Sequence, residues 1–379
     1  MSALLFSPIS LGPCTLANRV VVAPMCQYSA NDGCAGDWHL QQWMQYAMSG
    51  AGLVTLEATA VERGGRISHG CLGLYSDANE AALGRALAAA RHAALPGTRF
   101  GIQLAHAGRK AAVQRPWEGG APLGRGEDPW PTVAASAVAF APNYATPTAL
   151  DEDGMARVRL AFVRAAQRCL RLGFDAVEMH STHGYLLDTF LSPTANLRTD
   201  SYGGALENRM RFPLSVAKVL RTALPANIVL GARITGTDWS AGGWSQDDAA
   251  VYAQALKEIG VGYVSVSSGG IAPSLPIPTG LGYQVPPAAH IKAKTGMVTI
   301  AAGSIVAPEQ AEDILVAGKA DLIALARAFL DNPRWLWHAA DRLGAKMTYP
   351  PQYARVAPSL WQAARHARPL DFPPAARQA

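Results

Sequence analysis

Charged residues and cysteines are both scarce in this 379-residue sequence. Asp, Glu, Lys and Arg make up 16% of the chain, against about 25% in a typical globular protein, whereas hydrophobic residues make up 49%. Disordered chains have the opposite balance, so disorder is excluded and a large buried core is expected. The five cysteines form no C-x-x-C pair. Their odd number and spacing disfavour a disulfide framework, a zinc site and a thiol redox motif.

Long apolar runs and concentrated basic charge are also missing. No stretch of about eighteen apolar residues is uninterrupted, so we expect no membrane span. The first residues, MSALLFSP, lack the basic start and apolar core of a secretory signal. The net charge is +5 without a run of five Lys or Arg, unlike the basic stripe of a nucleic-acid binder. We therefore predict a soluble, cytoplasmic protein with no nucleic-acid or membrane partner. The small positive net charge is explained either by an ordinary, slightly basic surface or by an anionic cofactor or substrate.

Short runs rich in Val, Ile and Leu recur along the chain and alternate with helix-like stretches. Most runs are continuously apolar, which is typical of parallel strands covered on both faces. The expected strands are Arg19–Ala23, Leu53–Thr59, Phe100–Leu104, Ala176–His180, Ile228–Ile234, Tyr263–Ser267, Val298–Ala301 and Leu322–Leu325, and the expected helices are Ala81–Ala94, Met155–Leu172, Leu206–Leu224, Asp247–Ile259 and Pro308–Ala317. Eight such strands predict a (β/α)8 TIM barrel, with an open doubly wound sheet as the alternative.

The rest of the chain is predicted to decorate one barrel domain that spans residues 1–379. Residues 1–18 precede the first strand and form an N-terminal cap. Residues 106–153 are rich in Gly, Pro and Trp and form a long loop over the site, because loops of this length are usually functional. Residues 349–379 form a C-terminal extension that follows the last strand–helix unit.

In a TIM barrel the active site lies at the carboxyl ends of the strands. The residues at these ends are therefore candidates: Pro24 to Cys26, Ala58, Gln103, His106, His180 to His183, Tyr185, Arg233, Ser267 to Gly270, Gly303, Ser304, Ala326 and Arg327. The loops after the seventh and eighth strands of such barrels often bind phosphate. Gly303 and Arg327 suit that role. Alternatively, Gly303 is only a turn glycine and Arg327 is a solvent-exposed arginine at the start of a helix.

The histidines in His180-Ser-Thr-His183-Gly-Tyr185 admit three interpretations. They could ligate a metal, although only Glu178 is a nearby further ligand. They could be structural, or they could donate to a substrate oxygen with Tyr185 as an acid. Arg233 ends a buried strand and needs a charged or electron-rich partner, either a structural carboxylate or a group that becomes anionic in turnover.

Several motifs resemble, in this order, the Old Yellow Enzyme family of flavin-dependent ene-reductases, in its shorter, thermophilic-like bacterial branch. The resemblance spans nearly the whole chain. The motifs are Leu16-Ala-Asn-Arg19, Ala23-Pro-Met-Cys-Gln-Tyr28, Glu57-Ala-Thr-Ala60, Gln103-Leu-Ala-His-Ala-Gly-Arg-Lys110, Gly184-Tyr-Leu-Leu187, Phe190-Leu-Ser-Pro-Thr-Ala-Asn196, Arg198-Thr-Asp-Ser-Tyr-Gly-Gly204, Glu207-Asn-Arg209 and Ala326-Arg327.

The resemblance implies a tightly but non-covalently bound FMN across the barrel mouth. The implied FMN-binding residues are Ala23, Pro24, Met25, Cys26, Ala58, Gln103, Arg233, Gly303, Ser304, Ala326 and Arg327. Arg233 would face the flavin locus that becomes negative on reduction. His180 and His183 would bind the substrate oxygen, Tyr185 would be the proton donor, and Tyr28 would close over the substrate. Arg355 would reach a neighbouring subunit's site in a homodimer or homotetramer.

The implied activity is FMN-dependent NAD(P)H oxidoreduction, with NADPH or NADH as the reductant. The implied substrates are activated alkenes: enones, enals, nitroalkenes and maleimides. The sequence differs from the family at Ser181 and Thr182, where the family has Gly-Ala between its two histidines, and this affects the expected substrate range. A flavin-free phosphosugar isomerase or lyase and a non-catalytic flavin-binding protein are the alternative hypotheses.

Overall fold

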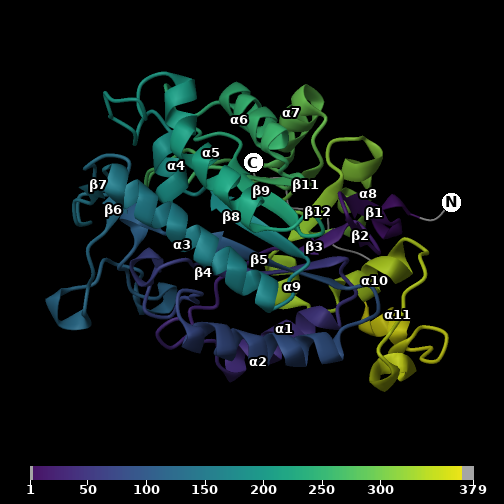
Figure 1. The fold of residues 1–379 in the computed structure, drawn as a ribbon. Coiled ribbons are helices and arrows are strands. Elements are labelled where there is room, and N and C mark those ends of the chain that lie inside the picture. Colours follow the sequence, from purple (N-terminus) through teal and green to yellow (C-terminus); the bar gives the residue numbers. More distant parts are fainter. Residues whose placement is uncertain (1–2, 369–379) are drawn as a thin grey trace.

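A closed parallel barrel of eight strands forms the centre of the computed structural model, which describes residues 3–368 (Figure 1). The strands are β3 (Val20–Val22), β4 (Leu53–Ala60), β5 (Arg99–Ala105), β8 (Ala176–Ser181), β9 (Val229–Thr235), β10 (Tyr263–Ser267), β11 (Thr299–Ala301) and β12 (Leu322–Leu325). They pair in this order, and β12 pairs with β3 to close the barrel. The predicted (β/α)8 fold is therefore confirmed, and each strand lies within two residues of its expected bounds.

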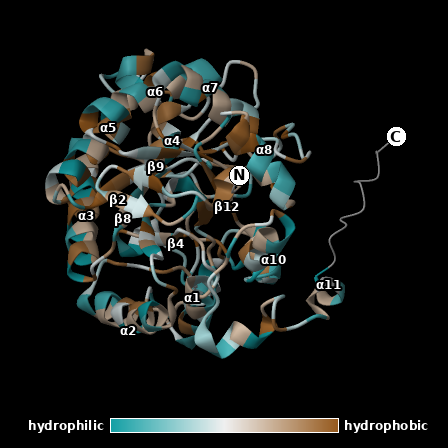
Figure 2. Cartoon of the chain, turned by 90° about the vertical axis from the view of Figure 1, so that its right-hand side faces the viewer, coloured by the Kyte–Doolittle hydropathy of each residue, from teal (hydrophilic) through white to brown (hydrophobic). Residues whose placement is uncertain are grey.

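Helices surround the strands, as both views show (Figures 1 and 2). They are α1 (Asp37–Ala47), α2 (Asp77–Ala93), α3 (Glu152–Arg171), α4 (Leu186–Leu191), α5 (Leu206–Ala223), α6 (Gln246–Ile259), α7 (Val285–Thr295), α8 (Pro308–Val316), α9 (Arg327–Asp331), α10 (Trp335–Arg342) and α11 (Ala364–Ala367). The five predicted helices match α2, α3, α5, α6 and α8. In the part of the chain described, no helix is long and apolar enough to cross a membrane.

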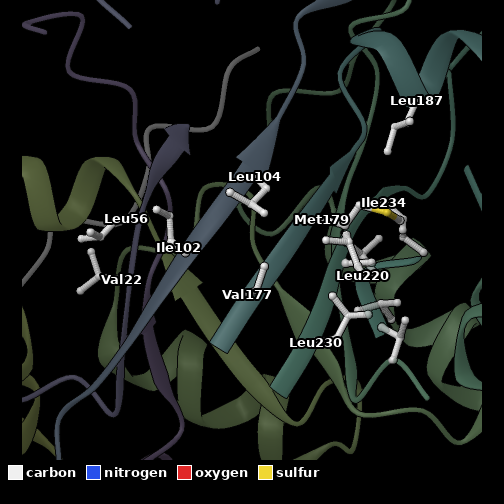
Figure 3. Packing of buried hydrophobic residues seen from close by; sticks show 14 of the residues in the cluster. Val22, Leu56, Ile102, Leu104, Val177, Met179, Leu187, Leu220, Leu230 and Ile234 are labelled. Atoms are coloured by element: carbon white, nitrogen blue, oxygen red, sulfur yellow. The ribbon is translucent and has the colours of Figure 1, made fainter. Parts of the chain in front are cut away.

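Side-chain alternation divides each strand between the helix layer and the barrel interior. On β8, Val177 and Met179 belong to the large core cluster between strands and helices (Figure 3). Ala176 belongs to a second cluster inside the barrel. The same alternation turns Glu178 and His180 inward. The continuous apolar run thus covers the outer face, while polar residues at alternate positions build the site.

The N-terminal segment closes the amino end of the barrel. It contains η1 (Leu4–Phe6) and an antiparallel hairpin of β1 (Ile9–Leu11) and β2 (Cys14–Leu16). Leu11, Cys14 and Leu16 join the interior cluster with Ile300. The hairpin therefore covers the end of the barrel opposite to the candidate site. Residues 1 and 2 of the predicted cap lie outside the described residues.

The two long non-repeating segments are also structured. Residues 106–153 contain η3 (Gly108–Lys110), η4 (Pro116–Glu118), η5 (Arg125–Glu127) and the short parallel pair β6 (Val133–Ala134) and β7 (Thr148–Ala149). After α10 the chain forms η6 (Pro351–Val356) and α11, which lie outside the helix ring beyond α10 (Figures 1 and 2). Residues 369–379 of the predicted C-terminal extension lie outside the described residues.

Candidate active site

A cavity of about 990 Å³ opens at the carboxyl end of the barrel, and we call it the mouth cavity. Ten of the residues that the sequence singles out line it: Ala23, His183, Arg233, Ser267, Ser268, Gly270, Gly303, Ser304, Ala326 and Arg327. They come from both ends of the chain and from six different strand ends. Closure of the barrel therefore brings them to one opening, as the rule for strand ends predicts.

One end of the mouth cavity has the geometry of a phosphate cradle. Gly303 has φ +97°, and a Cβ built there would lie 2.9 Å from Gln284 Cβ, so only glycine fits. Ser304 also has a left-handed backbone, with φ +51°. Arg327 begins α9 at the same end and lines the cavity. A backbone approach without a side chain, next to a guanidinium, suits an anionic ligand.

Arg233 lies on β9 with its guanidinium toward the mouth cavity. Its Nε is buried and has no hydrogen-bond partner within residues 3–368. Burial lowers the pKa of Arg233, and Glu178 is the first of the groups that oppose this effect. A buried, incompletely paired cation favours a ligand that carries or develops negative charge.

Gln103 and Glu178 lie below Arg233 on neighbouring strands. Gln103 Nε2 donates to Glu178 Oε1 at 2.7 Å, so the Gln103 carbonyl oxygen stays available as an acceptor. Burial raises the pKa of Glu178, and the positive charge of Arg233 opposes this effect only in part. Sequence reasoning considered Glu178 only as a possible metal ligand, because its pairing depends on the β5–β8 register. Ala58 lies on β4 within the register irregularity between Leu56 and Thr59.

The segment after β3 forms another wall of the site. Pro24, Met25 and Cys26 are half-buried and follow Ala23 directly. Burial raises the pKa of the Cys26 thiol well above its ordinary value, so the thiol is protonated at neutral pH. Tyr28 has a left-handed backbone, with φ +49°.

The long loop contacts Tyr28 from outside. Arg115 Nε donates to the Tyr28 carbonyl oxygen at 3.0 Å, and the Trp117 ring meets the Tyr28 ring edge-on with centroids 6.1 Å apart. Residues 106–153 thus support the position of the aromatic side chain that was predicted to cover the substrate.

The two histidines lie together at the end of β8. His183 Nδ1 and His180 Nε2 are 3.4 Å apart. Burial, reinforced by the charge of Arg233, lowers the pKa of His180 to about 3 and the pKa of His183 well below its ordinary value. Both imidazoles are therefore neutral at pH 7, and each offers one N–H. Two such donors at this spacing can share one acceptor oxygen.

Tyr185 follows as the N-cap of α4. Its ring centroid is 5.0 Å from that of His180 and 6.4 Å from that of His183. Burial raises the pKa of Tyr185 well above its ordinary value. The phenol therefore keeps its proton at neutral pH and can act as an acid beside the imidazole pair.

Lys110 and Asp188 were assigned no role by sequence reasoning, yet they position this loop. Lys110 Nζ donates to the carbonyl oxygens of His183, at 2.8 Å, and Gly270, at 3.0 Å, which ties the loop after β8 to the loop after β10. Asp188 Oδ2 accepts from the Gly184 N–H at 2.7 Å. The family motif that contains Lys110 could have identified this residue from the sequence, whereas no motif or strand end points to Asp188.

Two further predictions concern metals and Arg355. In the described part of the chain, no group of three His, Cys, Asp or Glu is arranged to hold a metal ion. Arg355 is exposed on η6 and does not line the mouth cavity of its own chain. The structure therefore does not bring Arg355 together with the other predicted site residues.

Comparison with known proteins assigns the family. The sequence profile of the NADH:flavin oxidoreductase / NADH oxidase family matches residues 4–345. This chain belongs to that family. The resemblance to Old Yellow Enzymes is thereby confirmed, and the chain is an oxidoreductase whose cofactor is FMN and whose reductant is a nicotinamide dinucleotide.

Named relatives agree over most of the chain. An NADPH dehydrogenase of Listeria monocytogenes serotype 4a (strain HCC23) is 40% identical over 354 residues, 93% of this chain and 98% of the relative. A solved structure of morphinone reductase is 28% identical with a TM-score of 0.74, and covers 93% of each chain. A morphinone reductase complex with tetrahydroNAD is 28% identical with a TM-score of 0.73, and covers 97% of each chain.

The site of this family member fits FMN on its own geometry. The cradle at Gly303 leaves room for a phosphate where a Cβ would collide with Gln284. The unpartnered Nε of Arg233 and the free carbonyl oxygen of Gln103 can bond a polar ring edge. Arg233 and Gly303 line the same opening, as an elongated ring-and-phosphate cofactor requires.

Proposed function

We propose that this chain is an ene-reductase of the NADPH dehydrogenase type, which reduces the C=C bond of α,β-unsaturated carbonyl compounds. The observation that carries the proposal is the convergence of two neutral imidazole donors beside a protonated phenol. Such an arrangement stabilises negative charge on a carbonyl oxygen and supplies a proton nearby. The names of the relatives favour NADPH over NADH as the reductant.

The residues that would hold FMN form two groups, one for the phosphate and one for the flavin ring. Gly303, Ser304, Ala326 and Arg327 would bind the phosphate, tightly but without a covalent bond. The ring would lie against Ala23, Pro24, Met25, Cys26, Ala58 and Gln103, with Arg233 at its electron-rich edge. When bound, FMN would supply the hydride-transfer chemistry between the nicotinamide and the β-carbon of the alkene.

The protein residues perform the remaining work on the substrate. His180 and His183 bind the carbonyl oxygen and withdraw electron density from the β-carbon. Tyr185 donates its proton to the α-carbon. Each imidazole donor contributes about 3–4 kcal/mol of transition-state stabilisation, on the scale of one oxyanion-hole donor. Tyr28 covers the bound alkene.

We also propose a substrate class and an oligomeric state for this enzyme. Enones, enals, nitroalkenes and maleimides all carry an electron-withdrawing group that two N–H donors can bind. The chain would act as a single domain in a cytoplasmic homodimer or homotetramer, in which Arg355 reaches the neighbouring site. Exposure of Arg355 on a segment outside the helix ring supports this role.

Tyr185→Phe tests the proposal through the two half-reactions. Stopped-flow absorbance measures flavin reduction by NADPH and its reoxidation by cyclohexenone. Loss of the acid should slow reoxidation about 10²–10⁴-fold and leave reduction nearly unchanged. Tyr202→Phe, which removes a hydroxyl that contacts Glu152 and no site residue, is the matched control and should alter neither rate. Equal slowing of both half-reactions by Tyr185→Phe would refute the acid role.

A wild-type flavin that NADPH reduces but no activated alkene reoxidises would refute the ene-reductase proposal as a whole. Such a result would favour an oxidoreductase that passes its electrons to an acceptor other than an activated alkene. The flavin-free phosphosugar hypothesis is not supported, because the family's cofactor is FMN.

A further inference from the structure

Two buried polar side chains stand behind His183, on the side away from His180. Ser267 ends β10 and is 2% exposed, and Gln284, the N-cap of α7, is 4% exposed. Ser267 Oγ lies 2.7 Å from His183 Nε2. Gln284 Nε2 lies 3.2 Å from Ser267 Oγ and 3.0 Å from Ser268 Oγ. The three elements meet because β8 and β10 flank β9 in the barrel wall and α7 follows β10.

The direction of each hydrogen bond follows from the chemistry of the groups. The Gln284 amide nitrogen can only donate, so Ser267 Oγ is an acceptor in that bond. The Ser267 oxygen has a second lone pair, but if it also accepted from His183 Nε2, the Ser267 proton would have no acceptor among the described residues. The proton therefore goes to its other close neighbour, His183 Nε2. A nitrogen that accepts a hydrogen bond carries no proton, and a neutral imidazole has one N–H. The proton of His183 therefore belongs on Nδ1.

Nδ1 is the nitrogen that faces His180, at 3.4 Å from His180 Nε2. With the proton on Nδ1, His183 points an N–H at the place where the two imidazoles converge. With the proton on Nε2, it would point a lone pair there and repel a carbonyl oxygen. The tautomer thus decides whether His183 attracts or repels the substrate oxygen.

The ring cannot easily turn away from this network. His183 has a left-handed backbone with φ +63°, and Lys110 Nζ holds its carbonyl oxygen at 2.8 Å. A Cβ built at Gly270 would lie 2.8 Å from His183 Cα, which shows how closely the two loops pack. The position of the proton, rather than that of the ring, is the remaining variable.

We propose that Ser267, oriented by Gln284, holds His183 in the Nδ1–H tautomer and so makes it a donor to the substrate carbonyl oxygen. Toward the substrate, Ser267 and Gln284 are positioning residues, because they act on it through His183. Both also line the mouth cavity that is proposed to hold FMN, so their variants are compared at saturating FMN. The consequence for catalysis rests on the proposed function, whereas the tautomer itself is a property of the protein.

The tautomer can be measured directly. In protein labelled with ¹⁵N-histidine, long-range ¹H–¹⁵N NMR distinguishes protonated from unprotonated ring nitrogens. The His183 signals are assigned by their loss in His183→Asn. The holoenzyme at pH 7 should show a protonated Nδ1 and an unprotonated Nε2. A protonated Nε2 in the wild-type protein would overturn the proposal.

Variants test the role of the two residues. Ser267→Ala should allow Nε2 to gain protonated population, and Ser267→Thr should restore the wild-type pattern because it keeps the hydroxyl. Ser265→Ala, which removes another buried hydroxyl from the same strand, should leave the pattern unchanged. Gln284→Glu replaces the amide donor by an acceptor, so Nε2 should become protonated, alone or together with Nδ1. An Nε2 that stays unprotonated in both Ser267→Ala and Gln284→Glu would also overturn the proposal.

The kinetic consequence is a separate readout. Ser267→Ala should slow flavin reoxidation by cyclohexenone about tenfold to a hundredfold, up to the loss of one oxyanion donor, and should change reduction by NADPH less than twofold. Equal effects on both half-reactions would refute the catalytic consequence. If the wild-type enzyme reduces no alkene but shows the Nδ1–H tautomer, the proposed function fails while the tautomer assignment stands.

Discussion

Asp188 should make the stability of this enzyme fall with rising pH, and Asp188→Asn should remove much of that dependence. Asp188 is fully buried on α4 and holds the Gly184 N–H between His183 and Tyr185, the two residues that we propose act on the substrate. Burial, and then the nearby Asp238, raise the pKa of Asp188 from 3.8 to about 8. The carboxyl is therefore protonated in the folded protein and ionised in the unfolded chain between about pH 4 and pH 8.

The sign and the size of this change in unfolding free energy follow from proton linkage. The unfolded state binds fewer protons in this range, so the free energy of unfolding decreases as pH rises. One proton gives a slope of at most about 1.4 kcal/mol per pH unit. Between pH 5 and pH 8 the wild-type protein should therefore lose about 3–4 kcal/mol relative to a variant that cannot ionise.

Asparagine is a suitable mimic of the protonated carboxyl. Thr235 Oγ1 lies 2.8 Å from Thr182 Oγ1 and 3.0 Å from Asp188 Oδ1, and its single proton can serve only one of them. When it donates to Thr182, it can accept from a protonated Asp188. In Asp188→Asn, Nδ2 can donate to Thr235 while Oδ1 accepts from the Gly184 N–H.

Equilibrium urea unfolding at pH 5, 6, 7 and 8 measures the effect. The two proteins should have similar unfolding free energies near pH 5, and the variant should be the more stable at pH 8. Asp313→Asn, at an exposed position on α8, controls for the loss of a surface carboxylate. A constant difference between Asp188→Asn and wild type over the whole range would show that the carboxyl is already ionised in the folded protein.

Three further substitutions test the cradle, the barrel interior and the subunit contact. Gly303→Ala, at φ +97° and 2.9 Å from Gln284, should weaken FMN binding at least tenfold in a fluorescence titration, and an unchanged affinity would argue against the phosphate cradle. Gly231→Ala places a Cβ 2.1 Å from the Tyr263 ring, so it should lower the unfolding free energy by about 1–3 kcal/mol; wild-type urea stability would show that the ring moves without cost. Arg355→Ala should raise KM for the alkene several-fold, whereas an unchanged KM in an intact oligomer would exclude a shared site.

The order of strands and helices could be predicted because each of these elements is indicated by the pattern of apolar residues within its own segment of sequence. Strands buried on both faces must be apolar along their length, so the run at Ala176–Ser181 is visible without any tertiary information. Among the helices of the described residues, α1, α4, α7, α9, α10 and α11 were missed. The segment of α7 begins Val-Pro-Pro, which resembles a turn, although proline is also well tolerated in the first turn of a helix. Helix α1 contains His, Gln and Trp at the positions it buries, which hides the apolar stripe.

The candidate site could be predicted in part for the same reason. Strand ends and family motifs identify His180, His183, Tyr185 and Arg233 by their own sequence positions. The roles of Glu178 beneath Arg233 and of Asp188 beneath the loop after β8 could not be assigned, because they depend on contacts with neighbouring strands: Gln103 on β5 for Glu178 and Thr235 on β9 for Asp188.

The sequence by itself determined that eight parallel strands would form and which residues would stand at their carboxyl ends, since both follow from the periodicity and punctuation of neighbouring residues. Only the tertiary structure decided the chemistry of those residues. Ser267 lies 84 residues from His183 and 17 from Gln284, and the pairing of β8 and β10 with β9 brings the three into one hydrogen-bonded chain. Protonation and tautomer depend on burial and on partners in space, and neither is encoded in any single stretch of the chain.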